Sequence, residues 1–265
     1  MCCFSIPTPK SLAQRLLQQR VRVSKTKIFA RMTAPGVQAL AYSMNLDSAK
    51  DVAMILPLPV RPNSGEDAVR FIDLHAHPRM FDELAALFEE PVLRSMPKSR
   101  GLVPQTLKVH KVGSFIARYV PTRFDFDRVD ERFWLPRVLF DAVREYADYG
   151  FAVFQLEPGN VTVHPMAFTF PTRDIERVFF PTVHLHDGRF HAKADFDHAL
   201  YYQHPRVVRQ GGQFEGDESS YQVPRKEYEG IVDKARPVLR RALHGKLANV
   251  DTWIDTGRPI TVSSS

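Results

Sequence analysis

Two adjacent cysteines, Cys2 and Cys3, follow the initiator methionine and are the only cysteines among 265 residues. Thiolates are soft ligands that favour copper(I) or zinc, so the pair predicts metal ligands at the N-terminus. A disulfide between the two is not expected, because its geometry would strain the peptide that joins them. The alternative is a short first strand on which these side chains pack as small apolar groups.

Histidines complete the predicted metal site. Asp187-Gly188 separates two runs of β-forming residues and favours a hairpin with a type I′ turn. In that hairpin His184 and His191 would be cross-strand neighbours. The full predicted ligand set is Cys2, Cys3, His164, His184, His186 and His191, with copper, zinc or iron as the cofactor.

Each histidine also has a structural interpretation. The hairpin histidines share a face with Arg and Lys, which is typical of a solvated surface and repels a cation. His164 lies on the same face of the expected strand as Met166, Phe168 and Phe170, so we expect it to point into apolar surroundings. A hydrogen bond within the core is the alternative there, because buried polar atoms are normally paired.

Cys2 supports a second hypothesis, in which it is a nucleophile. Removal of Met1 would leave a free α-amino group that can act as the base for the Cys2 thiol. The opening MC and the run TKIFARM, which ends in Arg31, resemble the choloylglycine-hydrolase and acid-ceramidase branch of the N-terminal nucleophile hydrolases. The resemblance implies amide hydrolysis with Cys2 and Arg31 in the site. The Asn-x-Asp continuation of that family is replaced by Met-Thr-Ala.

Few other motifs carry chemistry. The run DLHAHPRMF, with His75 and His77, resembles the H-x-H motif of metal-dependent amidohydrolases, but the alternating strands and helices of their barrel are not predicted. The sequence contains no phosphate-binding glycine loop and no G-x-S-x-G elbow. It also contains no legible nucleic-acid-binding module. The sequence excludes neither a small molecule nor a peptide as a substrate.

The net charge of +6 comes from the N-terminal segment, residues 1–46. This segment contains seven lysines and arginines and no acidic residue, while the remainder is almost neutral. A solvated face, an organelle transit peptide and a docking patch for an acidic partner all agree with that pattern. The third hypothesis is therefore a non-catalytic interaction protein that docks through its basic N-terminal segment.

Composition restricts the class of protein. Hydrophobic residues make up 44% of the chain, enough for a substantial core. No apolar run approaches the roughly 20 residues that a membrane-spanning helix needs. Because no disulfide framework is present, we expect a reducing compartment, the cytoplasm, with organelle targeting through residues 1–46 as the alternative.

Hydrophobic periodicity predicts an α+β fold, with a mainly antiparallel sheet and a few flanking helices, in one globular domain over residues 1–265. Helices are expected at 6–20, 82–90, 135–150 and 225–248. Strands are expected at 21–32, 37–46, 52–60 and 107–122, and hairpins at 151–170 and 178–196. Residues 91–105 and 209–220 are expected to be mobile loops. The leading functional hypothesis is a Cys/His transition-metal site for redox or hydrolytic chemistry.

Overall fold

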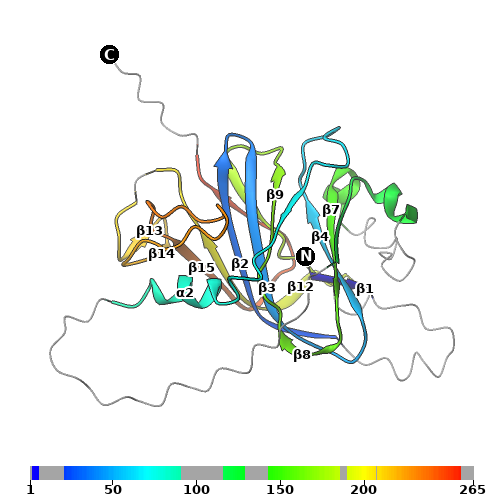
Figure 1. The fold of residues 1–265 in the computed structure, drawn as a ribbon, viewed down its shortest axis with the longest axis horizontal. Helices are drawn as coiled ribbons and strands as arrows, with labels where there is room; N and C mark the ends of the chain where they lie inside the picture. The colour runs from blue at the N-terminus through cyan, green and yellow to red at the C-terminus, as the bar shows by residue number, and fades with distance from the viewer. Residues whose placement is uncertain are drawn as a thin grey trace.

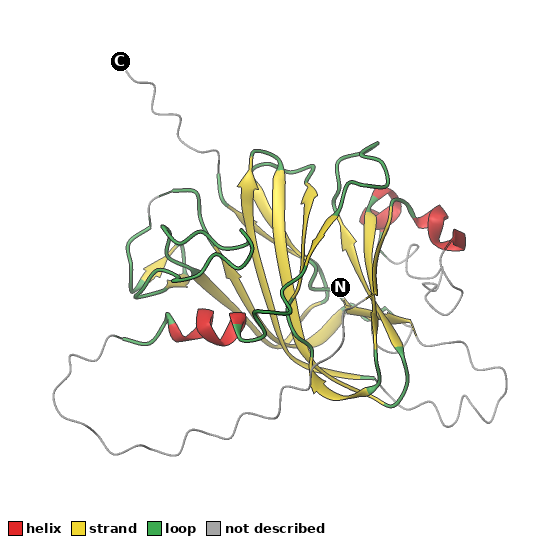
Figure 2. Cartoon of the chain, viewed as in Figure 1, coloured by secondary structure: helices red, strands yellow, loops and turns green. Residues whose placement is uncertain are grey.

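Two β-sheets packed face to face form the body of the protein (Figure 1). The structure is a computed structural model that describes residues 2–5, 21–90, 116–128, 143–185, 190–206 and 208–257. Strands dominate these residues, and the few helical segments lie on the outside of the sheets (Figure 2). Among the described helices, none is long and apolar enough to cross a membrane.

Sheet A contains the N-terminal strand in its interior. Its order is β11 (His184–Leu185), β1 (Cys2–Ser5), β4 (Val52–Leu58), β7 (Gly150–Leu156) and β6 (Ile116–Val120). Strand β1 is antiparallel to β4 and parallel to β11. Every residue of β4 is buried, which confirms the prediction of a central strand covered on both faces.

Sheet B is larger. Its order is β13 (Gln213–Phe214), β14 (Asp217–Ser219), β15 (Leu239–Ala248), β12 (Lys193–Tyr202), β2 (Arg22–Ala34), β3 (Val37–Ser48), β9 (Met166–Pro171) and β5 (Arg70–Ile72). Strand β8 (Gly159–Thr162) also pairs with β3. Strands β10 (Arg177–Phe180) and β16 (Thr252–Asp255) form a separate two-stranded ribbon.

Aromatic side chains join the two sheets. Phe154 of β7 and Phe168 of β9 are 2% and 0% exposed, and their ring centroids lie 6.0 Å apart. Phe71 of β5 meets the Phe154 ring edge-on at 5.6 Å. These rings belong to one hydrophobic cluster that extends over both inner faces, so the main core lies between the sheets.

Both outer faces are covered as well. The 3-10 helices η1 (Arg123–Arg128) and η3 (Arg144–Asp148) and the β10–β16 ribbon pack on sheet A. Helix α2 (Met80–Ala86) and the loop of residues 225–238 pack on sheet B. The first part of the helix expected at 82–90 is thereby confirmed, with its start two residues earlier.

The expected α+β class is wrong, and the fold is a β-sandwich. Of the helix expected at 225–248, the first part is an irregular loop and the second part is strand β15. Leu239 and Leu243 are four residues apart, as on one face of a helix, but β12 pairs with the segment along its whole length, so tertiary pairing overrides the helical spacing. Of the helix expected at 135–150, residues 129–142 lie outside the described residues, and β7 begins at Gly150.

The two expected hairpins are also wrong. Strand β7 pairs with β4 and β6 in sheet A, whereas β8 and β9 pair with β3 in sheet B. Strand β11 pairs with β1, and β12 pairs with β15 and β2. The turn residues 186–189 lie outside the described residues, as do 6–20 and the expected loop at 91–105. Part of the other expected loop, 209–220, forms the β13–β14 hairpin.

Candidate functional site

The structure brings Cys2 and His184 to neighbouring positions, because Cys2 is opposite His184 in the parallel β1–β11 register. Cys3 is opposite Leu185 in the same register. The His184 ring stacks near His198 of β12, with the two Nε2 atoms 3.2 Å apart. At that distance one Nε2 carries the shared hydrogen and the other accepts it. Phe196 lies beside both rings, with its centroid 4.5 Å from that of His184.

Asn249 holds this part of the molecule together through its side-chain amide. Its Oδ1 accepts the His184 backbone N–H at 2.7 Å, and its Nδ2 donates to the His184 carbonyl at 3.0 Å. The same Nδ2 donates to the His191 carbonyl at 2.8 Å. Asn249 is 1% exposed. Its side-chain amide pairs with the backbone of β11 as a neighbouring strand would. His184 and His191 are connected through this amide rather than as cross-strand neighbours.

Asp251 fixes the residues just before β11. Its Oδ1 accepts the backbone N–H groups of Thr182 at 2.8 Å and Val183 at 3.1 Å. Its Oδ2 accepts the hydroxyl of Tyr146 at 2.6 Å. The turn between β15 and β16 therefore sets the path of β11, and β11 in turn borders the N-terminal strand.

The remaining predicted ligands are not gathered at this place. His164 lies between β8 and β9 of sheet B, where it is 8% exposed and faces the His75 ring at 6.4 Å. Its Nδ1 is 3.3 Å from the Pro165 carbonyl, and burial lowers the pKa of His164. His191 is exposed, and His186 lies outside the described residues.

The interpretation as a transition-metal protein is therefore corrected. Among the described residues, no group of three or more His, Cys, Asp and Glu side chains is placed to hold a metal ion. The hairpin that would have gathered the imidazoles does not form, because β12 pairs with β15 instead. The copper, zinc or iron expected from the sequence has no described site.

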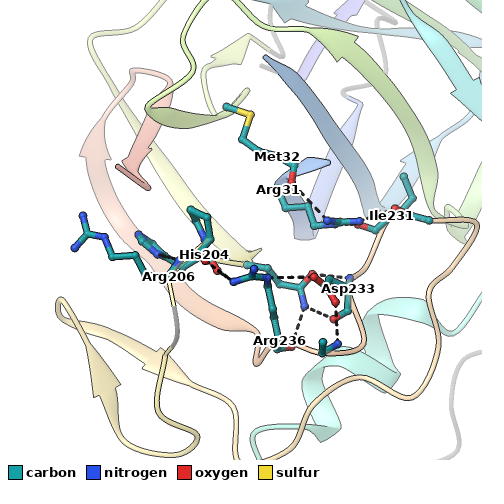
Figure 3. A network of polar contacts seen from close by, with 11 residues as sticks. Arg31, Met32, His204, Arg206, Ile231, Asp233 and Arg236 are labelled. Atoms are coloured by element: carbon teal, nitrogen blue, oxygen red, sulfur yellow. Dashed lines mark hydrogen bonds and ion pairs between the residues drawn. The ribbon is translucent and has the colours of Figure 1, made fainter. Parts of the chain in front are cut away.

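Arg31 of β2 lies in a second polar network, in which it holds a loop (Figure 3). Its guanidinium donates to the carbonyls of Ile231 at 2.7 Å and Gly230 at 2.9 Å. Tyr228, Glu229 and Gly230 have φ values of 50°, 55° and 83°, a left-handed conformation that is unfavourable for the two non-glycine residues. Burial lowers the pKa of Arg31, and its described hydrogen bonds all go to backbone carbonyls.

We expect Arg31→Met to destabilise the protein by about 2 kcal/mol, because two carbonyls lose a charged donor. Chemical denaturation measures this change, and amide exchange at residues 228–232 should accelerate. Arg22→Met is the matched control, because Arg22 lies on the same strand and is exposed. Equal stability of the two variants would contradict the role assigned to Arg31.

Gln203 and Arg236 hold the next turn of the same loop. The Gln203 amide donates to the carbonyls of Asp233 at 2.7 Å and Arg236 at 2.9 Å, and it accepts the Asp233 N–H at 2.8 Å. The Arg236 guanidinium bonds to the Asp233 carboxylate at 3.1 Å and to the His204 carbonyl at 3.2 Å. The loop is thus attached to the end of β12 by side chains from both directions (Figure 3).

His204 lies in this network and is 2% exposed. Its Nδ1 accepts the Arg206 backbone N–H at 3.0 Å, so Nε2 carries the hydrogen of the neutral ring. That Nε2 has no hydrogen-bond partner. Burial first, and then the Arg206 cation, lower the pKa of His204; Arg236 acts in the same direction, and Glu215 and Asp255 oppose it.

Acid should therefore destabilise the fold through His204. The unfolded chain takes up the proton at a higher pH than the folded chain does. The free energy of unfolding therefore decreases as the pH falls through the ordinary imidazole value of about 6.5, by at most ~1.4 kcal/mol per pH unit. Urea titrations at several pH values should show a shallower slope for His204→Gln. An unchanged slope in His204→Gln would contradict this account.

Sequence reasoning missed His198, Asn249 and Asp251. His198 lies on the same face of β12 as Phe196 and Leu200. This spacing predicts a face that points into the core and is visible in the sequence. Asn249 and Asp251 look like ordinary turn residues, and only the position of β11 shows what they bind.

No protein-family model and no curated protein sequence matches the chain. Among solved structures, baculovirus P35 matches with a TM-score of 0.52 and 13% identity, over 90% of this chain and 98% of P35. A complex of caspase-8 with P35 matches with a TM-score of 0.45 and 14% identity, over 88% and 96% of the two chains. The first match shows that this chain has the fold of baculovirus P35.

Proposed function

We propose that this protein acts by binding another protein, and that its partner is a protease of the caspase type. The observation that carries the proposal is the fold shared with P35 over nearly the full length of both chains. P35 itself is found in a complex with caspase-8. This proposal replaces the Cys/His metal hypothesis and agrees best with the third hypothesis, an interaction protein.

The described part of the basic N-terminal segment, residues 21–46, is built into sheet B. Lys27 bonds to Asp82 of α2 at 3.0 Å, and Arg31 holds the loop at Ile231. These two cations therefore already have partners within the fold. If the basic segment docks a partner, its contribution comes from the other cations, which include Lys10, Arg15 and Arg20.

The test uses the full chain and purified active caspase-8. Hydrolysis of a fluorogenic peptide is measured while the chain is titrated, and the mixture is examined by size-exclusion chromatography and intact mass. We expect stoichiometric loss of activity and a complex that elutes as one species. Full activity and separate elution at about 10 μM of each protein, where micromolar affinity would be detected, would overturn the proposal.

Two controls sharpen this test. Papain, a cysteine protease of a different family, shows whether inhibition is selective. A variant with Lys10, Arg15 and Arg20 replaced by glutamine tests docking through the basic segment. If that segment contributes, the variant has a lower affinity for caspase-8 than the wild type. Its affinity also changes less with salt concentration, because fewer exposed charges are screened. If affinity and salt dependence are unchanged, docking occurs elsewhere on the protein.

A further inference from the structure

Among the strands that the structure describes, β15 has a long edge with no neighbour. On one side it pairs with β12 over its whole length, from Leu239 to Ala248. On the other side β14 pairs only with Leu239 and Arg240. Among the described strands, none pairs with residues 241–248 on that side. An open edge of this length is a template for an added strand.

The hydrogen-bond pattern shows which backbone groups face the open edge. Toward β14, the Ser220 N–H donates to the Val238 carbonyl at 2.9 Å. Toward β12, the Asn249 N–H donates to the Ala192 carbonyl at 3.0 Å. These directions alternate from one residue to the next along an antiparallel strand. The backbone N–H and C=O groups of the even-numbered residues therefore point toward the open edge. These residues are Ala242, His244, Lys246 and Ala248.

Two odd-numbered residues of β15, Leu247 and Gly245, have features that favour contact with an added strand. Leu247 is 37% exposed and is one of few large apolar side chains on the described surface. Gly245 has a φ of +79°, and no atom lies within 4 Å of where a Cβ would stand. A glycine within a strand is typical of a place where another backbone comes close.

A second copy of the strand satisfies both features when a two-fold axis passes through Gly245. Gly245 then lies opposite the partner's Gly245 as a non-hydrogen-bonded pair, for which the two Cα atoms are only about 4.5 Å apart. Leu247 lies opposite the partner's Leu243, so the exposed leucine gains an apolar cross-strand contact. The even-numbered residues of the two copies form hydrogen-bonded pairs with one another.

The charges on the outer face agree with the same register. Within one copy Asp197 is opposite His244, and Asp195 is opposite Lys246. Across the axis His244 lies opposite the partner's Lys246. Each row of side chains therefore runs from carboxylate through imidazole and ammonium to carboxylate. Neither end of the row leaves a cation without a neighbouring carboxylate.

The register centred on His244 is less favourable. It places His244 opposite itself and Leu247 opposite the partner's Arg241. Asp217 already occupies that end of the edge, where its carboxylate binds the Arg241 guanidinium at 2.8 Å through both oxygens. A strand added in this register would meet the buried Asp217.

We propose that β15 pairs antiparallel with β15 of a second copy about a two-fold axis at Gly245, which joins the two B sheets into one. The interface is isologous and closed, so it produces a dimer rather than a fibre. This inference does not depend on protease binding, since it rests on the open edge of β15 among the described strands and on the residues along that edge.

Sedimentation velocity of the full chain over a concentration series tests the proposal. We expect a dimer at about 100 μM that dissociates on dilution. His244→Pro removes an N–H that faces the open edge and leaves the bonds to β12 intact. Leu247→Lys replaces the exposed apolar partner without touching the backbone. Each should raise the dimer dissociation constant at least about tenfold.

Phe124→Lys is the matched control, because Phe124 is 74% exposed and lies on η1, outside β15. It should leave the dissociation constant unchanged. A wild-type chain that stays monomeric at about 100 μM overturns the proposal and leaves the edge to a strand from another protein. A dimer that neither His244→Pro nor Leu247→Lys weakens also overturns it, because the contact then lies elsewhere.

Discussion

Phe154→Ala is expected to destabilise the protein by about 3–5 kcal/mol, the range for removing a fully buried aromatic ring from a core. Phe154 is 2% exposed and lies between the sheets, where it meets Phe71 and Phe168. Its removal leaves a cavity that neither neighbouring ring can fill without leaving its own position. Folding stability is measured by urea denaturation monitored by circular dichroism.

Phe124→Ala provides the comparison for that measurement. Phe124 is 74% exposed, and its ring contacts the Arg123 guanidinium at 4.8 Å. Its loss should cost about 1 kcal/mol or less. If the two substitutions cost the same, the aromatic cluster between the sheets does not dominate the stability of the fold.

Strands β2, β3 and β4 could be predicted because their hydrophobic periodicity is strong and local. Residues 21–32, 37–46 and 52–60 form β2, β3 and β4 with bounds within a few residues of those expected. The wholly apolar run in β4 also predicted its burial on both faces. In these segments local propensity and tertiary pairing agree.

The end of the chain could not be predicted in the same way. Residues 239–248 are rich in leucine, alanine, lysine and arginine, which are good helix formers. Strand β12 is their pairing partner, and the paired residues are 37 to 55 positions apart in sequence, from Tyr202–Leu239 to Lys193–Ala248. Such long-range pairing is not visible in a window of ten residues, so the composition of this segment predicts a helix.

The candidate site shows the same limit. The sequence singled out Cys2 and His184, and the register of β1 with β11 brings them together. It did not single out Asn249, whose amide replaces a neighbouring strand for β11. A local motif is visible in a sequence, but a side chain that binds a distant backbone is visible only in the fold.

Asn249→Leu is therefore expected to have the second large effect, a loss of about 3–5 kcal/mol. The leucine has similar size but leaves the His184 N–H and the carbonyls of His184 and His191 without their hydrogen bonds from residue 249. Each buried backbone group that loses its partner costs about 1–3 kcal/mol. Asn249→Asp keeps the acceptor for the His184 N–H and loses the donor to both carbonyls, so most of the loss should persist.

The position of this amide gives the prediction a local readout as well as a global one. Because β11 borders β1 in parallel, loosening β11 should speed amide exchange in β11 itself and at Cys2–Ser5 of β1. Asn160→Leu, at an exposed position of β8, should change neither rate. If Asn249→Leu lowers stability but leaves exchange in β1 at the wild-type rate, the N-terminal strand is held by β4 alone. If both change together, the turn after β15 determines how firmly the N-terminus is inserted in sheet A.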